Sequence, residues 1–68
     1  MKREPVESSC LSSVGHRGTT LELEFRSGSV YEYADVPEAE YRGLLAAPSL
    51  GRYFHAHIRD RYPYRRIS

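Results

Sequence analysis

The strongest constraint on the fold is an alternation of apolar and charged residues over positions 20–25, with the sequence TLELEF. Two leucines and Phe25 fall on one side of an extended chain, and Glu22 and Glu24 fall on the other. A period of two residues is typical of a β-strand with one buried face. We therefore expect a strand here, with its apolar side turned toward the core.

The loop that follows decides which side of the sheet the tyrosines occupy. A second strand is expected over residues 29–33, and the three residues Arg-Ser-Gly lie between the strands. A three-residue hairpin loop is a type I turn closed by a left-handed residue, and glycine suits that third position. Leu23 then pairs with Tyr31 and Leu21 with Tyr33, so both tyrosines join the apolar side. A two-residue loop would instead place them among the glutamates.

Two helices are expected after the hairpin. Pro37 suits the first turn of a helix over residues 37–46, because a proline there loses no hydrogen bond. Pro48 ends this helix, and Ser49 is a favourable N-cap for a second helix over residues 50–59. Apolar residues recur at spacings of three and four in both segments, so each helix has one face for the core.

The expected fold is α+β, with a small antiparallel sheet of about three strands followed by two helices packed on one face. The remaining strand is placed over residues 10–16. Residues 1–8 are expected to be a loose terminus, and residues 61–68 an extended basic tail, because Pro63 cannot lie inside a regular helix. The tail can lie along the sheet edge or across the helices. All 68 residues are expected to form one domain.

The composition favours a cytoplasmic protein, most simply a monomer. No apolar run approaches the roughly 20 residues that a membrane span needs, and the first residues lack the apolar core of a signal peptide. Cys10 is the only cysteine, so no disulfide can form within the chain. A lone thiol in a small chain favours a reducing compartment.

Neither a metal site, a cofactor nor an enzyme activity is expected. His55 and His57 are two residues apart and point in different directions on a helix, while His16 is distant in sequence. The lone cysteine has no CxxC partner. Glu22 and Glu24 are expected on a solvated face with no pocket to shift their pKa values. A concave site around His16 or His55 would revive an enzymatic hypothesis.

Charge is divided along the chain. Residues 1–40 carry a net charge of −4, and residues 41–68, with six arginines and one aspartate, carry +5. Arginine binds phosphate through a planar fork of donors, and interleaved tyrosines can stack on unpaired bases. We therefore expect a nucleic-acid-binding surface on the second helix and the tail, formed by Arg52, Arg59, Arg61, Arg65, Arg66, Tyr62 and Tyr64.

Four blocks, in this order and at this spacing, resemble the KTSC domain: residues 20–25, 28–33, 36–37 and 49–59. That family is named for a C-terminal extension of some lysyl-tRNA synthetases, and it also occurs as small stand-alone bacterial proteins. The likeness extends from about Val6 to Ile67. The family's hallmark is Tyr-x-Tyr, here Tyr31 and Tyr33, while His55 stands where asparagine is expected.

The resemblance implies an α+β fold and RNA, either single-stranded or transfer RNA, as a partner. It implies no reaction. The alternative is a protein-interaction or accessory domain without a nucleic-acid ligand, whose acidic strand face and basic helical end would meet a charged partner. The solvent exposure of Tyr31 and Tyr33 separates two interpretations of the motif. Buried rings indicate that the motif belongs to the core, and exposed rings indicate a binding face.

Overall fold

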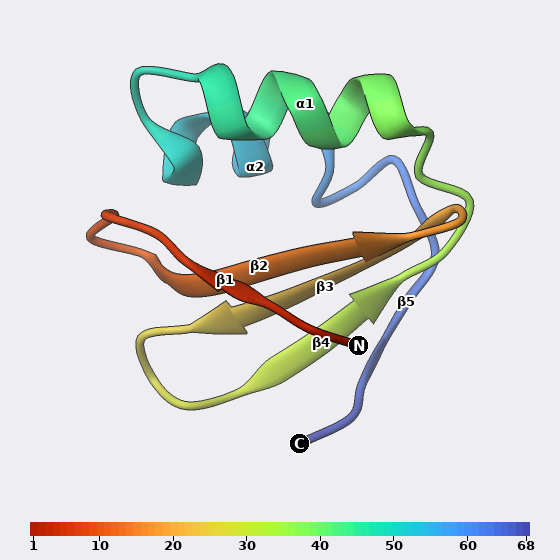
Figure 1. Cartoon of the computed structure of the whole chain (residues 1–68), viewed down its shortest axis with the longest axis horizontal. Helices are drawn as coiled ribbons and strands as arrows, with labels where there is room; N and C mark the ends of the chain where they lie inside the picture. The colour runs from red at the N-terminus through yellow and green to blue at the C-terminus, as the bar shows by residue number, and fades with distance from the viewer.

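Five antiparallel strands form a meander, and both helices pack on the same face of the sheet (Figure 1). The computed structural model describes all 68 residues. Its elements are β1 (Glu4–Pro5), β2 (Leu11–Arg17), β3 (Thr20–Phe25), β4 (Val30–Tyr33), α1 (Glu38–Ala46), α2 (Leu50–His57) and β5 (Tyr64–Arg66). The strands lie in chain order across the sheet, and the helices are inserted between β4 and β5. The expected α+β class is confirmed.

The predicted hairpin register is confirmed. Leu23 pairs with Tyr31 and Leu21 pairs with Tyr33. The three-residue loop ends at Gly28, whose φ of 97° lies in the left-handed region that favours glycine. Both tyrosines therefore share the helix-covered side of the sheet with the leucines of β3.

The sheet has five strands where about three were expected, because both chain ends add an edge strand. Residues 1–8, expected to be a loose terminus, contain β1, which pairs with β2. Residues 61–68, expected to be an extended basic tail, contain β5, which pairs with β4. Neither end has an apolar alternation, and each is held by the backbone donors and acceptors that an edge strand leaves open.

The helices lie close to their predicted positions. The Ser49 hydroxyl accepts a hydrogen bond from the backbone N–H of Arg52 at 3.3 Å, so the predicted N-cap of α2 is confirmed. Pro37 is the N-cap of α1 and not its first residue. The second helix ends at His57, two residues earlier than predicted.

The core lies between the sheet and the two helices. Its buried residues are Leu11, Val14, Leu21, Leu23, Tyr33, Val36, Leu44, Phe54 and Ile58. The pairing of β2 with β3 shifts register between Leu11 and Ser13. This irregularity inserts one residue, so Leu11 and Val14 both face the core although they are three positions apart. The same insertion explains why β2 shows no clean alternation in the sequence.

One carboxylate connects the helices to the segment before β5. The Tyr53 hydroxyl donates to Glu40 Oε1 at 2.6 Å, and the Tyr62 hydroxyl donates to Glu40 Oε2 at 3.0 Å. Gly43 permits this arrangement, because a Cβ there would collide with the Tyr53 hydroxyl oxygen. The hydrogen bond to Glu40 is the main reason that the pKa of Tyr53 rises to about 12.

Tyr33 is 4% exposed, so Tyr33→Ala is expected to lower the free energy of unfolding by about 3–5 kcal/mol, as removal of a large buried ring does. Urea unfolding followed by circular dichroism measures this loss. Tyr33→Phe is the matched control and should stay folded, because the hydroxyl makes no hydrogen bond within the protein. Equal losses in the two variants would contradict the assignment of the ring to the core.

Gly43→Ala is expected to destabilise the protein by about 1–3 kcal/mol, because the new methyl group displaces the Tyr53 ring and separates it from Glu40. In a Tyr53→Ala background the same change should instead stabilise by about 1 kcal/mol, since alanine is the better helix former. Chemical denaturation of the four proteins in this double-mutant cycle measures both values. If Gly43→Ala is equally destabilising in the Tyr53→Ala background, the contact between position 43 and the Tyr53 ring is not the cause of the loss.

The free energy of unfolding is expected to fall as the pH rises from about 10 to 12. In the folded protein Tyr53 has its pKa raised from 10.0 to about 12, so its proton is retained where the unfolded chain releases it. The stabilisation is therefore complete below pH 10 and is lost through pH 12. Urea titrations across this pH window should show that the free energy of unfolding falls less steeply with pH for Tyr53→Phe than for the unsubstituted protein. Equal pH dependence in the two proteins would refute the raised pKa of Tyr53.

Candidate functional site

A groove of about 530 Å³ lies on the helix-covered side of the sheet, where α2 ends and leaves the hairpin and β5 uncovered. We name it the aromatic groove. Its lining residues are Cys10, Phe25, Ser27, Ser29, Tyr31, Tyr33, Phe54, His55, Arg59, Asp60 and Tyr64. They come from the β3–β4 hairpin, from α2 and the turn that follows it, from β5, and from the residue before β2.

The floor of the aromatic groove is a set of interlocked rings. Phe25 meets Tyr31 edge-to-face at 5.6 Å between ring centroids, and it meets Phe54 at 5.4 Å. Tyr64 lies against Tyr33 at 5.4 Å and against Tyr31 at 5.8 Å. Such contacts hold rings in fixed orientations. Tyr64 is nevertheless 61% exposed, so one side of its ring is free for a ligand.

Three phenol groups in the groove have no partner within the protein. The only tyrosine hydroxyls that form hydrogen bonds are those of Tyr53 and Tyr62. No buried side-chain polar atom lacks a partner, so the hydroxyl of the otherwise buried Tyr33 reaches solvent in the groove. Burial is the largest cause that raises the pKa of Tyr33 to about 12. At neutral pH this phenol therefore remains a hydrogen-bond donor and acceptor.

The polar rim carries one unpaired charge of each sign. Arg59 and Asp60 belong to none of the three ion pairs of the protein. The Arg59 guanidinium lies 3.3 Å from His55 Nδ1, and this is the only side-chain hydrogen bond of Arg59. Both charged groups are exposed and remain available to a ligand.

The groove includes His55, so it is the kind of concave site that would revive an enzymatic hypothesis. Nucleophilic catalysis needs a nucleophile within hydrogen-bond distance of a base. No hydrogen bond joins His55 to Cys10 or to a hydroxyl group, and its ring contacts Arg59. No catalytic arrangement is indicated. No cluster of three or more histidine, cysteine, aspartate or glutamate side chains is placed to hold a metal ion.

The sequence-predicted nucleic-acid residues do not share one surface. Arg59 and Tyr64 line the aromatic groove. Tyr62 is half-buried and bonded to Glu40, so it is not a free stacking platform. Arg52 is exposed on α2 outside the groove.

The pairing of β5 with β4 separates two arginines that are adjacent in sequence. Arg66 lies opposite Tyr31, on the helix-covered side. Arg65 lies opposite Glu32 on the other side, and its Nε donates to a Glu32 carboxylate oxygen at 3.0 Å. Successive residues of a strand point to opposite faces, so only Arg66 is directed to the groove side. Arg61 is exposed in the turn before β5.

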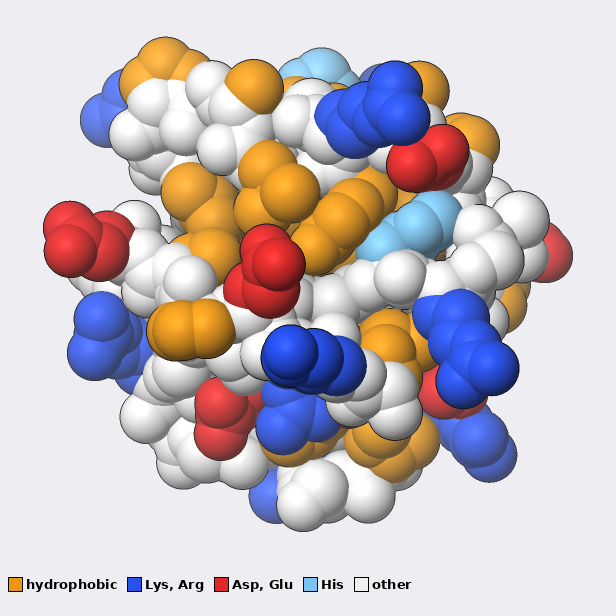
Figure 2. All heavy atoms as spheres, in the orientation of Figure 1, with side chains coloured by type: hydrophobic (Ala, Val, Ile, Leu, Met, Phe, Trp, Pro, Cys, Tyr) orange, Lys and Arg blue, Asp and Glu red, His pale blue; other side chains and the backbone are white.

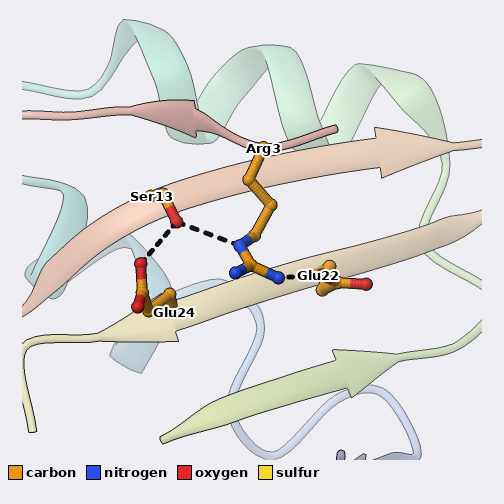
Figure 3. A network of polar contacts seen from close by, with 4 residues as sticks. All are labelled: Arg3, Ser13, Glu22 and Glu24. Carbon is orange, nitrogen blue, oxygen red and sulfur yellow. Dashed lines mark hydrogen bonds and ion pairs between the residues drawn. The ribbon is translucent and has the colours of Figure 1, made fainter. Parts of the chain in front are cut away.

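The open face of the sheet is less acidic than the sequence suggests. Arg3 forms an ion pair with Glu22 and donates to Ser13 Oγ at 3.0 Å, and Ser13 donates to Glu24 at 2.9 Å (Figure 3). Glu22 is only 7% exposed. The expectation of two glutamates on a solvated face is therefore wrong for Glu22, because the N-terminal segment covers it.

Charged side chains of both signs are scattered over the face drawn in Figure 2, and apolar atoms gather between α1 and the sheet. This face carries no patch of a single sign. No helix in the structure has the length and apolar character required to cross a membrane.

Sequence reasoning missed the groove because its parts come from four segments. Phe25 was assigned correctly to an apolar face, and it packs against Phe54 of α2. The second helix ends at His57, before Arg59 and Asp60, and β5 returns to place Tyr64 beside Tyr33. Asp60 had no signal of its own, since a single aspartate after a helix is common on protein surfaces.

Comparison with known proteins identifies relatives of the same size. The sequence pattern of the KTSC domain matches residues 7–62. The crystal structure of a KTSC domain protein from Yersinia pestis is 35% identical and superposes with a TM-score of 0.95, covering 98% of this chain and 97% of that one. An uncharacterized protein of Stutzerimonas stutzeri is 43% identical over 70 residues, covering 98% of this chain and 99% of its own length.

Much longer proteins contain a similar segment. The lysine–tRNA ligases of Trichormus variabilis and of a Nostoc species are each 49% identical over 49 residues, which is 72% of this chain. The match covers 9% of the length of each ligase. The matched pattern, the full-length relatives and the superposed crystal structure agree, and the chain belongs to the KTSC domain family.

Proposed function

We propose that this KTSC domain is a non-catalytic module that binds single-stranded RNA in the aromatic groove. An unpaired base stacks on the exposed side of Tyr64, and the arginines around the groove contact the rest of the RNA. The observation that carries the proposal is a 61% exposed tyrosine ring packed against the rings of Tyr31 and Tyr33, in a groove that an unpaired arginine also lines. Base stacking on aromatic side chains and charge from arginine are the common elements of single-strand recognition.

The arginines that support this function are fewer than the sequence suggested. Arg65 already neutralises Glu32, whereas Arg59 and Arg61 belong to no ion pair. Arg66 donates through Nε to the backbone oxygen of Ser68 at 3.0 Å, which leaves its terminal N–H groups for a phosphate. Three phosphate contacts give a log–log salt slope of about −2 for a single strand. The net charge of +1 predicts weak non-specific binding, so stacking must contribute much of the affinity.

Related segments occur in lysine–tRNA ligases, which favours RNA as the ligand class. The name of those proteins includes transfer RNA, whose loops and 3′ end present unpaired bases. A protein-interaction role has less support, because the glutamates of the strand face are largely paired with Arg3 and Arg65 and offer little free charge to a basic partner.

Tyr64→Ala is expected to weaken binding of a labelled single-stranded RNA by about 5- to 150-fold, the range for loss of one stacked base. Arg59→Ala should weaken binding more modestly and reduce the salt slope by about 0.7. Fluorescence anisotropy at two salt concentrations measures both effects, with transfer RNA as a second ligand.

Two variants serve as controls for this experiment. Tyr64→Phe keeps the ring and should retain most of the affinity. Arg52→Ala removes the same charge as Arg59→Ala from an exposed position outside the groove and should change the affinity least. Absence of RNA binding at low salt, or equal losses in the Arg52 and Arg59 variants, would count against the aromatic groove as the RNA site.

A further inference from the structure

We infer that the base held in the aromatic groove is guanine, and that the Asp60 carboxylate recognises its Watson–Crick edge. The inference rests on the proposed RNA-binding function and adds the identity of the base. Asp60 is the only acidic residue among those that line the groove. It lies in the half of the chain with a net charge of +5 and forms no ion pair there.

An unpaired carboxylate is an unusual group to find in a site for a polyanion. It repels phosphate, and it can only accept hydrogen bonds. A carboxylate at such a site is therefore useful when the ligand presents N–H groups. The bases differ in this respect: guanine presents an imino N–H and an amino group side by side, which match the two carboxylate oxygens in a bidentate, charge-assisted contact.

The other bases fit this carboxylate less well. Adenine and cytosine each present one amino group beside a ring nitrogen that carries a lone pair, and that lone pair repels the second carboxylate oxygen. Uracil presents one N–H between two carbonyl oxygens, which repel the carboxylate on both sides. Guanine is the one standard base that satisfies both oxygens.

The neighbouring arginine completes the match. Arg59 precedes Asp60 in the chain, and both line the groove without pairing with another charge. Guanine offers acceptors at O6 and N7 next to its donor edge, and arginine contact to these atoms is the commonest specific contact to guanine. Two adjacent residues of opposite charge therefore correspond to the donor and acceptor edges of one base. Arg59 contacts a phosphate, as proposed above, when no guanine occupies the groove.

Arg59 and Asp60 line the same groove as the Tyr33 phenol. Burial raises the pKa of Tyr33 most, while the charge of Arg59 lowers it and that of Asp60 raises it. The volume of about 530 Å³ is within the usual range for sites that hold a small ligand. A purine ring between the phenols and the charged rim would contact both.

The test compares nine-nucleotide RNAs that are all uridine, or that carry one central guanosine or one central inosine. Inosine lacks the amino group of guanosine but keeps the imino N–H and both acceptors. The guanosine RNA should bind about 5- to 150-fold more tightly than the uridine RNA, the discrimination expected of one bidentate contact. The inosine RNA should lose most of that preference.

Asp60→Asn provides the second half of the test. It should weaken binding of the guanosine RNA and slightly strengthen binding of the uridine RNA, because the carboxylate no longer repels phosphate. Asp35→Asn is the matched control: Asp35 is exposed outside the groove, and asparagine tolerates its φ of 63°. This control should leave the guanosine preference unchanged.

The outcomes separate the two proposals. Equal affinity for all three RNAs, with no change of preference in Asp60→Asn, overturns guanine recognition and leaves RNA binding in the groove intact. No binding of any RNA at low salt overturns both. A guanosine preference that survives Asp60→Asn and is not reduced by inosine overturns the assignment of Asp60.

Discussion

The pairing of β3 with β4 is the interaction on which the rest of the structure depends. A left-handed Gly28 closes the loop after three residues, and this loop length places Tyr31 and Tyr33 on the side of the leucines. A register shifted by one residue would turn both rings to the opposite face and leave the core without its largest side chain from β4. Core packing and the aromatic groove therefore both depend on the three-residue turn between β3 and β4.

The return of β5 to the edge of β4 completes the aromatic groove. It places Tyr64 against the Tyr-x-Tyr rings, and it directs Arg65 and Arg66 to opposite faces. A basic tail is thereby divided into one arginine that neutralises Glu32 and another that is directed to the groove side. The strand pairing, and not the charge of the segment, determines which arginines are available to a ligand.

The features that sequence predicted well are those fixed by local chemistry. Alternation over β3, glycine in the hairpin loop and serine before α2 each act on residues close in the chain, and the structure agrees at all three places. The features that sequence could not supply depend on distant partners. Tyr62 bonds to Glu40 across 22 positions, and Glu22 is covered by Arg3 across 19. No periodicity marks such partners, so the groove emerged only from the fold.

The exposure of β5 has a consequence for how tightly the groove holds a ligand. All three residues of this strand are exposed, and they form an edge of the sheet, following the two helices in the sequence. Edge segments with little buried surface open at a small free-energy cost, without unfolding of the core. The outer wall of the groove is therefore its least stable part. A ligand that contacts Tyr64 must bind the molecules in which β5 is paired with β4. Such a ligand would slow hydrogen exchange at the backbone amides of β5.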